Sequence, residues 1–177
     1  IRKCELLDSY PLLRRNYSNF LHANYFSELL LKCEIPEIDS RDYFEIFKKT
    51  ISKLSKSNNG IEIKFNFEIK LMKILGIEPN LEACVKCNGD IWYLESKKNP
   101  LPKYSTPYQL DVSMGGLRCP KCCIDNSFVT YLNPGSIAFF YSRQKKFQNS
   151  SLVKPTLNNL KELDKAFYIY FRYFFGK

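Results

Sequence analysis

Two C-x-x-C pairs constrain the fold of this chain more than any other feature of its sequence. Residues 83–90 read ACVKCNGD and residues 118–123 read RCPKCC. The total of seven cysteines is odd, which argues against a closed disulfide framework. A redox pair works alone at a helix N-terminus in a βαβ unit, and no parallel-sheet pattern surrounds these pairs. Four thiolates instead suit tetrahedral Zn²⁺, and the predicted ligands are Cys84, Cys87, Cys119 and Cys122.

The predicted zinc site is structural, because four cysteines close the coordination shell and leave no position for a catalytic water. The pairs are separated by 31 residues, more than the usual 15–20 or so. Three prolines between residues 100 and 107 mark an inserted loop, and lengthening a loop adds little to its closure cost. We therefore expect one helical domain, residues 1–177, with an inserted zinc-binding module at residues 81–128. Cys123 could replace Cys122 as a ligand, although the two-residue spacing is the commoner one.

No pattern of an enzyme active site accompanies the cysteines. The sequence has no Gly-rich phosphate loop, no G-x-S-x-G and no H-x-E pair of the zinc-deaminase type. His22 is the only histidine and lies far from the cysteines, in a stretch that reads as helix. We therefore expect a protein that is not an enzyme.

No apolar run approaches the roughly 20 residues that cross a bilayer, so we expect a soluble protein without a membrane partner.

The net charge of +9 is distributed unevenly along the chain. Residues 84–177 carry 14 basic and 6 acidic groups, whereas residues 1–83 carry 13 and 12. A basic half favours a polyanion such as DNA, because neutralising phosphates releases counterions. The alternatives are a general bias towards lysine and compensation of the negative zinc–thiolate cluster by neighbouring cations. The candidate DNA-binding residues are Arg143, Lys145, Lys146, Lys161 and Lys165, together with Lys97, Lys98 and Lys103.

Hydrophobic periodicity predicts a mainly helical chain. The expected helices are one long helix at residues 9–32, a second capped by Asp39 or Ser40 and ending at Ser57-Asn58-Asn59-Gly60, a third from Pro134 to about Phe147, and a last from Thr156 towards Gly176. Their expected core residues are Tyr10, Leu13, Tyr17, Phe20, Leu21, Tyr25, Leu29 and Leu31 in the first, Phe44, Phe47, Ile51 and Leu54 in the second, and Leu160, Leu163, Phe167, Tyr170 and Phe174 in the last. Residues 61–71, IEIKFNFEIKL, alternate apolar and polar side chains, a period that predicts a strand.

Four stretches match the landmarks of a known family. They read LLDSYPLLRRN at 6–16, NYFSELLLK at 24–32, FEIKLMKILGIEPNLEACVKC at 67–87 and LDVSMGGLRCPKC at 110–122. In this order they resemble the C-terminal domain of RecO, a bacterial recombination mediator. The resemblance implies a mainly α fold, a helical bundle with an inserted Cys4 zinc-ribbon-like module. It also implies a helix at residues 61–75, against the period of two, and an N-terminal OB-fold outside this sequence.

The resemblance also implies a function that needs no covalent chemistry. RecO proteins bind single- and double-stranded DNA, anneal complementary strands, engage the acidic tail of single-strand binding protein and, with RecR, help to load RecA. The expected contact with RecR lies mainly in the OB-fold, and the expected location is the cytoplasm, at the nucleoid. A rival interpretation is a zinc-ribbon interaction module of a transcription or translation factor.

A tail-binding site is expected on the helix around residue 67. An acidic, apolar-ended tail needs cations beside an apolar pocket, and the candidate residues are Lys64, Lys70, Lys73 and Phe67. Asn66 stands where the family often has arginine, which weakens the comparison at this place. The alternative is that these lysines are only the solvated face of the helix.

Overall fold

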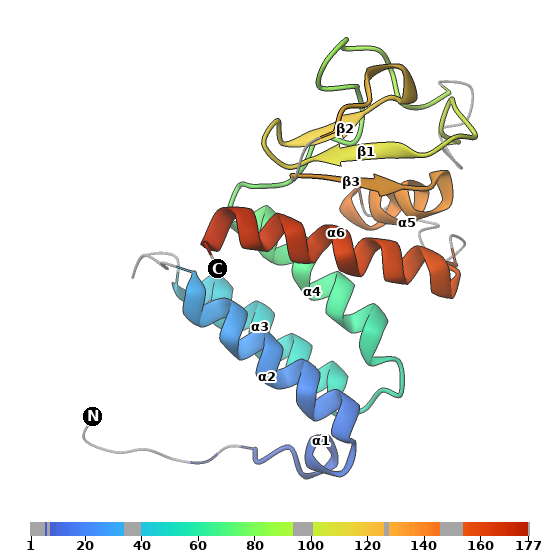
Figure 1. The fold of residues 1–177 in the computed structure, drawn as a ribbon. Coiled ribbons are helices and arrows are strands. Elements are labelled where there is room, and N and C mark those ends of the chain that lie inside the picture. The colour runs from blue at the N-terminus through green and yellow to red at the C-terminus, as the bar shows by residue number, and fades with distance from the viewer. Residues whose placement is uncertain are drawn as a thin grey trace. The chain divides into compact units, whose positions relative to one another are not determined.

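The structure is a computed structural model that describes residues 6, 8–33, 40–93, 101–125, 128–145 and 154–176 (Figure 1). Contacts between residues divide the chain into two compact units, Ile1–Ile74 and Leu75–Lys177. The predicted fold class is confirmed, since the chain is mainly helical and carries a small sheet and a cysteine cluster. None of the helices within the described ranges is long and apolar enough to span a membrane.

The first unit is built from helices α1 (Pro11–Arg15), α2 (Tyr17–Lys32), α3 (Ser40–Leu54) and α4 (Gly60–Ile74). Large apolar side chains fill the space between them. Phe26 of α2 packs on Phe67 of α4 with ring centroids 4.4 Å apart, and both rings are buried. Burying a ring of this size contributes roughly 1.5–3 kcal/mol. The packing of α2 on α4 therefore rests on phenylalanine contacts between distant parts of the sequence.

The prediction of one long helix at residues 9–32 is wrong, because the chain breaks at Asn16. This residue is extended, and its side chain accepts a hydrogen bond from the Asn19 amide at 3.1 Å, which caps the start of α2. The break also shifts the buried face: Tyr17 is 75% exposed, whereas Phe26 is fully buried. The other residues predicted for the core that are exposed instead are Phe20, Leu21 and Leu31 of α2, Phe44 of α3 and Phe174 of the last helix.

Residues 60–74 form a helix, as the family resemblance implied and against the alternating pattern. The pattern misleads because α4 is buried on more than one side: Phe65, Phe67, Glu68 and Leu71 are all inaccessible or nearly so. A helix surrounded by other elements does not show a single apolar stripe. Gly76 follows the helix with a left-handed φ of 68°, a conformation in which glycine commonly ends a helix.

The second unit contains a three-stranded antiparallel sheet in the order β2-β1-β3. The strands are β1 (Tyr108–Asp111), β2 (Gly116–Arg118) and β3 (Val129–Leu132). Leu110 in the central strand lies opposite Leu117 on one side and Thr130 on the other. β1 and β2 are joined by a tight turn and form the hairpin that leads into the second cysteine pair. The proposed module boundaries at residues 81–128 stay a prediction.

Helices α5 (Pro134–Lys145) and α6 (Leu157–Phe175) complete the second unit, and α6 lies along β3 (Figure 1). Both begin where the sequence predicted, at Pro134 and after the N-cap Thr156. The predicted end of the first at Phe147 falls outside the described residues. The inward residues of α6 include Leu163, Phe167 and Tyr170, as predicted. The Tyr170 hydroxyl donates to the Ile77 carbonyl at 2.6 Å, which attaches α6 to the segment before the cysteines.

Candidate metal centre

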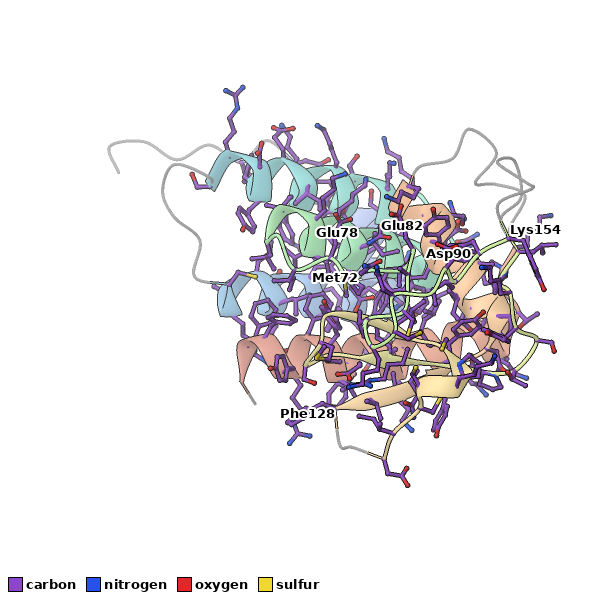
Figure 2. The ribbon with its side chains drawn as sticks, turned by 90° about the horizontal axis from the view of Figure 1, so that it is seen from above. Met72, Glu78, Glu82, Asp90, Phe128 and Lys154 are labelled. Atoms are coloured by element: carbon purple, nitrogen blue, oxygen red, sulfur yellow. The ribbon has the colours of Figure 1, made fainter. Side chains whose placement is uncertain are left out.

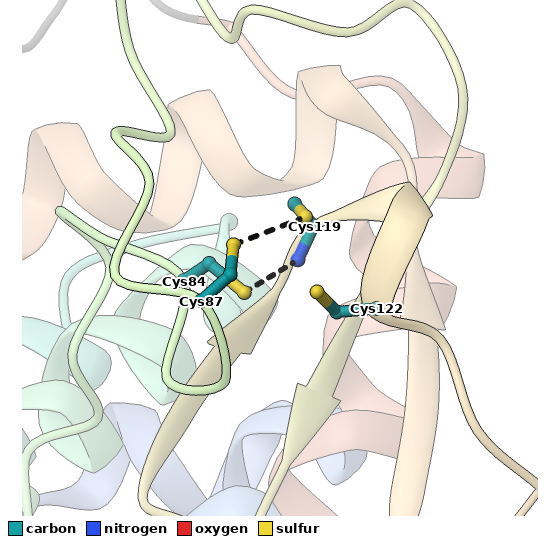
Figure 3. A group of neighbouring side chains, drawn as sticks. All are labelled: Cys84, Cys87, Cys119 and Cys122. Carbon is teal, nitrogen blue, oxygen red and sulfur yellow. Dashed lines mark hydrogen bonds between the residues drawn. The ribbon is translucent and has the colours of Figure 1, made fainter.

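Four cysteine sulfurs lie close together in the second unit (Figure 3). The Sγ atoms of Cys84, Cys87, Cys119 and Cys122 are all within 4.8 Å of one another, and those of Cys87 and Cys119 are 3.8 Å apart. Four sulfurs bound tetrahedrally at about 2.3 Å from one Zn²⁺ are separated from each other by about 3.8 Å. The cluster therefore fits a single tetrahedral metal ion, and it contains the four cysteines that the sequence singled out.

Each C-x-x-C pair is bent by a turn of its own. In the first pair, the Asn88 amide donates to the Cys84 carbonyl at 2.8 Å, and Asn88 takes a left-handed φ of 57° that asparagine tolerates well. In the second, a 3₁₀ turn at Pro120–Cys122 lets the Cys122 amide donate to the Cys119 carbonyl at 2.9 Å. Because these bonds are local, each pair is bent without contacts from distant parts of the chain.

Strand β2 brings the two pairs together. The backbone of Asn80 exchanges hydrogen bonds with the chain at Gly115 and Leu117, at 2.8 and 2.9 Å, and the Val85 amide donates to the Leu117 carbonyl at 2.9 Å. The approach is close at Gly116, where an added Cβ would lie 2.6 Å from the Asn80 carbonyl oxygen. The first cysteine turn is thereby held against the strand that ends at the second pair.

The surroundings of the four thiols affect their ionisation unequally. Burial opposes ionisation of Cys84, but hydrogen bonds from the amides of Cys119, Cys87 and Lys86 outweigh it and lower the pKa of this thiol to about 6. Burial and the neighbouring thiols raise the pKa of Cys122 to about 12. A coordinated thiol loses its proton to the charge of the metal. A bound cation would therefore supply positive charge to offset the repulsion between four adjacent thiolates.

Cys123 lies beside the cluster and does not belong to it. Its sulfur is directed at the Cys119 carbonyl, 3.7 Å away. The group of ligand atoms close enough to share one ion contains Cys122 in its place. Of the two alternatives that the sequence left open, the geometry favours Cys122 as the fourth ligand.

A buried ion pair ties the sheet to the second cysteine pair. Arg118 Nε donates to Asp111 Oδ2 at 2.6 Å, with at most 9% of either side chain exposed, and Arg118 also reaches the Cys122 carbonyl at 3.5 Å. Burial raises the pKa of Asp111, but hydrogen bonds from Ser113, Arg118 and the Met114 amide hold it below its usual value. Its ionised form therefore stabilises the fold above the usual pKa, and this contribution is lost as the pH falls through the lowered value.

The pairing of Asp111 with Arg118 was missed by sequence reasoning. In the sequence, the cations beside the cysteines were interpreted only as compensation for the thiolates, and no partner was predicted for Asp111. The register of the β1–β2 hairpin places Asp111 opposite Gly116 and Arg118 opposite Gln109, so the contact is a diagonal one across two strands. The signal in the sequence that could have indicated this ion pair is the alternation of apolar and polar residues on either side of Gly115-Gly116, which is typical of a hairpin.

Several of the predicted DNA-binding cations have acidic or aromatic partners in the second unit. Lys145 pairs with Glu82 at 2.7 Å and Lys103 with Asp90 at 3.4 Å, and both acids are labelled in Figure 2. The Arg143 guanidinium lies 5.0 Å from an aromatic ring of its own helix. Lys161 and Lys165 are exposed on α6, whereas Lys97, Lys98 and Lys146 fall outside the described residues. Exposed cations one helical turn apart therefore occur on α6.

The four predicted tail-binding residues of α4 do not share one open surface. Phe67 is 1% exposed and belongs to the core of the first unit. Lys64 is 12% exposed and pairs with the buried Glu68 at 2.9 Å. Lys70 and Lys73 are exposed. The role of these residues in binding a tail stays a prediction, and Lys70 and Lys73 are the two that a partner can reach.

Comparison with known proteins gives a consistent result. Residues 14–170 match the family described as "Recombination protein O C terminal". The chain is 24% identical over 122 residues to a "DNA repair protein RecO" of Syntrophus aciditrophicus, which covers 69% of this chain and 43% of that protein. The protein of the same name from Clostridium novyi is 26% identical over 164 residues, 92% of this chain and 58% of its own length.

A third relative, the "DNA repair protein RecO" of Syntrophomonas wolfei, is 29% identical over 139 residues, which cover 78% of this chain and 50% of that protein. The chain thus spans about half the length of the curated relatives that it matches. The family match covers most of the chain and includes both cysteine pairs. A zinc-ribbon module of a transcription or translation factor would not explain a match of this extent. The chain therefore belongs to the recombination protein O family, whose C-terminal region it matches.

Proposed function

We propose that this chain is the C-terminal half of a DNA repair and recombination mediator. The observation that carries the proposal is the family match over residues 14–170, with the four-cysteine cluster inside it. In this role the protein binds and anneals single-stranded DNA, engages the tail of single-strand binding protein and helps RecR to load RecA. It works in the bacterial cytoplasm, at the nucleoid, and makes or breaks no covalent bond.

The metal in this proposal is a structural Zn²⁺ held by Cys84, Cys87, Cys119 and Cys122. Soft thiolate donors select zinc or an iron–sulfur centre over magnesium, calcium and manganese. The sulfurs all lie within 4.8 Å of one another, and those of Cys87 and Cys119 are 3.8 Å apart, which suits a single ion in a closed tetrahedron. Bound there, the ion would keep the first cysteine turn joined to the hairpin that carries the second. The protein surfaces that contact DNA and partner proteins would then be placed on rigid elements.

The basic character of residues 84–177 supports a DNA-binding role for the second unit. We expect this chain to bind single-stranded DNA weakly and without sequence preference, because its surface cations would contact phosphates. The logarithm of the affinity should fall linearly with the logarithm of the salt concentration between about 50 and 200 mM. Fluorescence anisotropy of a labelled oligonucleotide measures this slope. An affinity that does not respond to salt would show that the positive charge does not act on phosphates.

We further expect the chain to bind the acidic C-terminal tail of single-strand binding protein with an affinity in the micromolar range, about −8 kcal/mol or weaker. Exposed Lys70 and Lys73 would attract the carboxylates, so the variant Lys70→Glu/Lys73→Glu should weaken binding and reduce its salt dependence. A labelled tail peptide titrated onto the chain measures both. Removal of the terminal apolar residue of the peptide should cost most of the affinity, since a buried aromatic anchor contributes more than rim charges.

A matched control for the tail experiment is Lys48→Glu/Lys53→Glu, which makes the same charge change on exposed positions of α3 in the same unit. It should leave the affinity nearly unchanged. Lys64→Glu is unsuitable as a test, because it would place a second acid beside the buried Glu68 and destabilise the unit. If the control and the Lys70/Lys73 variant weaken binding equally, the lysines of α4 act only through net charge and the site lies elsewhere.

A further inference from the structure

The outward face of α6 carries three cations and one aromatic ring in a single line. Lys161, Lys165, Tyr168 and Arg172 are spaced by four, three and four residues, so they follow one face of the helix. All four are exposed, and Tyr168 leaves 64% of its surface in water. The opposite face of the helix packs into the unit. These four residues are named the α6 stripe.

The cations of the α6 stripe differ from the other predicted DNA-binding residues in their surroundings. In the part of the chain that the structure describes, Lys103 and Lys145 are paired with acids, whereas Lys161, Lys165 and Arg172 form no ion pair. The helix contains two acids of its own. Glu162 accepts hydrogen bonds from Asn133 and Ser136 and is occupied in anchoring α5, and Asp164 is exposed beside the stripe. The stripe therefore presents a positive edge to solvent.

The exposed ring of Tyr168 indicates that the α6 stripe would bind single-stranded rather than double-stranded nucleic acid. A ring that remains mostly in water gains little stability from packing, so its position is not explained by the core. Aromatic side chains between cations are the arrangement that holds single strands, because unpaired bases stack on the ring while phosphates contact the cations. In a duplex the faces of the bases are covered by their neighbours. The stripe extends over about 16 Å along the helix, enough for a few nucleotides.

We propose that the α6 stripe is a binding site for single-stranded DNA, in which Tyr168 stacks on one base while Lys161, Lys165 and Arg172 contact the phosphates on either side. The inference rests on the DNA-binding role proposed above. It adds a location on α6, a preference for unpaired bases, and two residues, Tyr168 and Arg172, that are absent from the candidates predicted from the sequence. It involves only residues of one helix in the second unit.

Stacking is tested with Tyr168→Ala and three nucleic acids: an oligo-dT, an abasic oligonucleotide of the same length, and a duplex. The affinity for oligo-dT should fall about tenfold, while that for the abasic strand and the duplex should change by less than about twofold. Tyr168→Phe should bind oligo-dT almost as the natural chain does. Tyr17→Ala is the matched control, since Tyr17 is also an exposed helical tyrosine but lies in the first unit.

The cations are tested with the triple variant Lys161→Gln/Lys165→Gln/Arg172→Gln, which should weaken binding of every nucleic acid and reduce the salt slope by about 2. If Tyr168→Ala binds oligo-dT normally while the triple variant does not, stacking is wrong and only phosphate contacts remain. If neither variant differs from the natural chain, the stripe is not the binding site, although the proposed function stands. Failure of the natural chain to bind any DNA would overturn both the stripe and the DNA-binding role.

Discussion

Replacing Cys84 with serine is expected to remove the bound metal and to lower the stability of the second unit by several kcal/mol. The cluster would lose one of four thiolates, and structural zinc binding contributes directly to the free energy of folding. A loss of several kcal/mol corresponds to a fall in Tm of about 10 °C or more for a chain of this length. Metal analysis of the purified protein should give about one zinc per natural chain and almost none for the variant.

The fluorescence of Trp92 is a convenient measure of unfolding in this experiment. Trp92 is the only tryptophan, is buried, and donates from its indole to the Leu81 carbonyl at 2.6 Å, close to the first cysteine pair. Cys123→Ser is the matched control, because it removes the neighbouring thiol and should retain both the metal and the stability. A Cys123→Ser variant without zinc, alongside a Cys122→Ser variant with zinc, would assign the fourth ligand to Cys123. A metal-free natural chain of full stability would contradict the site altogether.

Replacing Asp111 with asparagine is expected to lower the free energy of unfolding of the second unit by about 3–5 kcal/mol. The substitution preserves the size of the side chain and removes the charge that Arg118 faces at 2.6 Å in a buried position. The guanidinium would then remain buried without a counter-charge, and the asparagine, with one oxygen and one NH2 group, could not accept from both Arg118 and the turn at Ser113 and Met114. Urea unfolding followed by Trp92 fluorescence measures the change.

The control for this pair is Glu82→Gln, which breaks the ion pair with Lys145 in the same unit. That pair has a similar distance of 2.7 Å, but its side chains are 45% and 58% exposed. Exposed pairs contribute about 1 kcal/mol or less, because water screens the charges. If Asp111→Asn costs no more than Glu82→Gln, burial does not strengthen the Asp111–Arg118 pair. If the Asp111→Asn chain also loses its metal, the pair holds the second cysteine turn in place.

The sequence by itself determined the features that depend on neighbouring residues. The two-residue spacing identified the four cysteines whose sulfurs lie together, because each pair is bent by local backbone bonds. The contacts of Asn80 and Val85 with β2 bring the two pairs together. Pro134 and Thr156 predicted the starts of α5 and α6, since proline suits the first helical position and the Thr156 side chain caps the first turn. The family resemblance, and not the period of its apolar residues, predicted the helix at residues 61–75.

Only the tertiary structure decided which side chains are buried and how the polar ones are paired. The break at Asn16 turned Tyr17 outwards, and the packing of α4 placed Phe67 in the core, although the sequence suggested a binding surface for it. The pairing of Arg118 with Asp111 follows from the register of the hairpin. The exposed line formed by Tyr168 and the cations could be recognised only once the inward face of α6 was known. Burial and ion pairing depend on segments that are distant along the chain, and a local pattern carries no information about which segments pack against it.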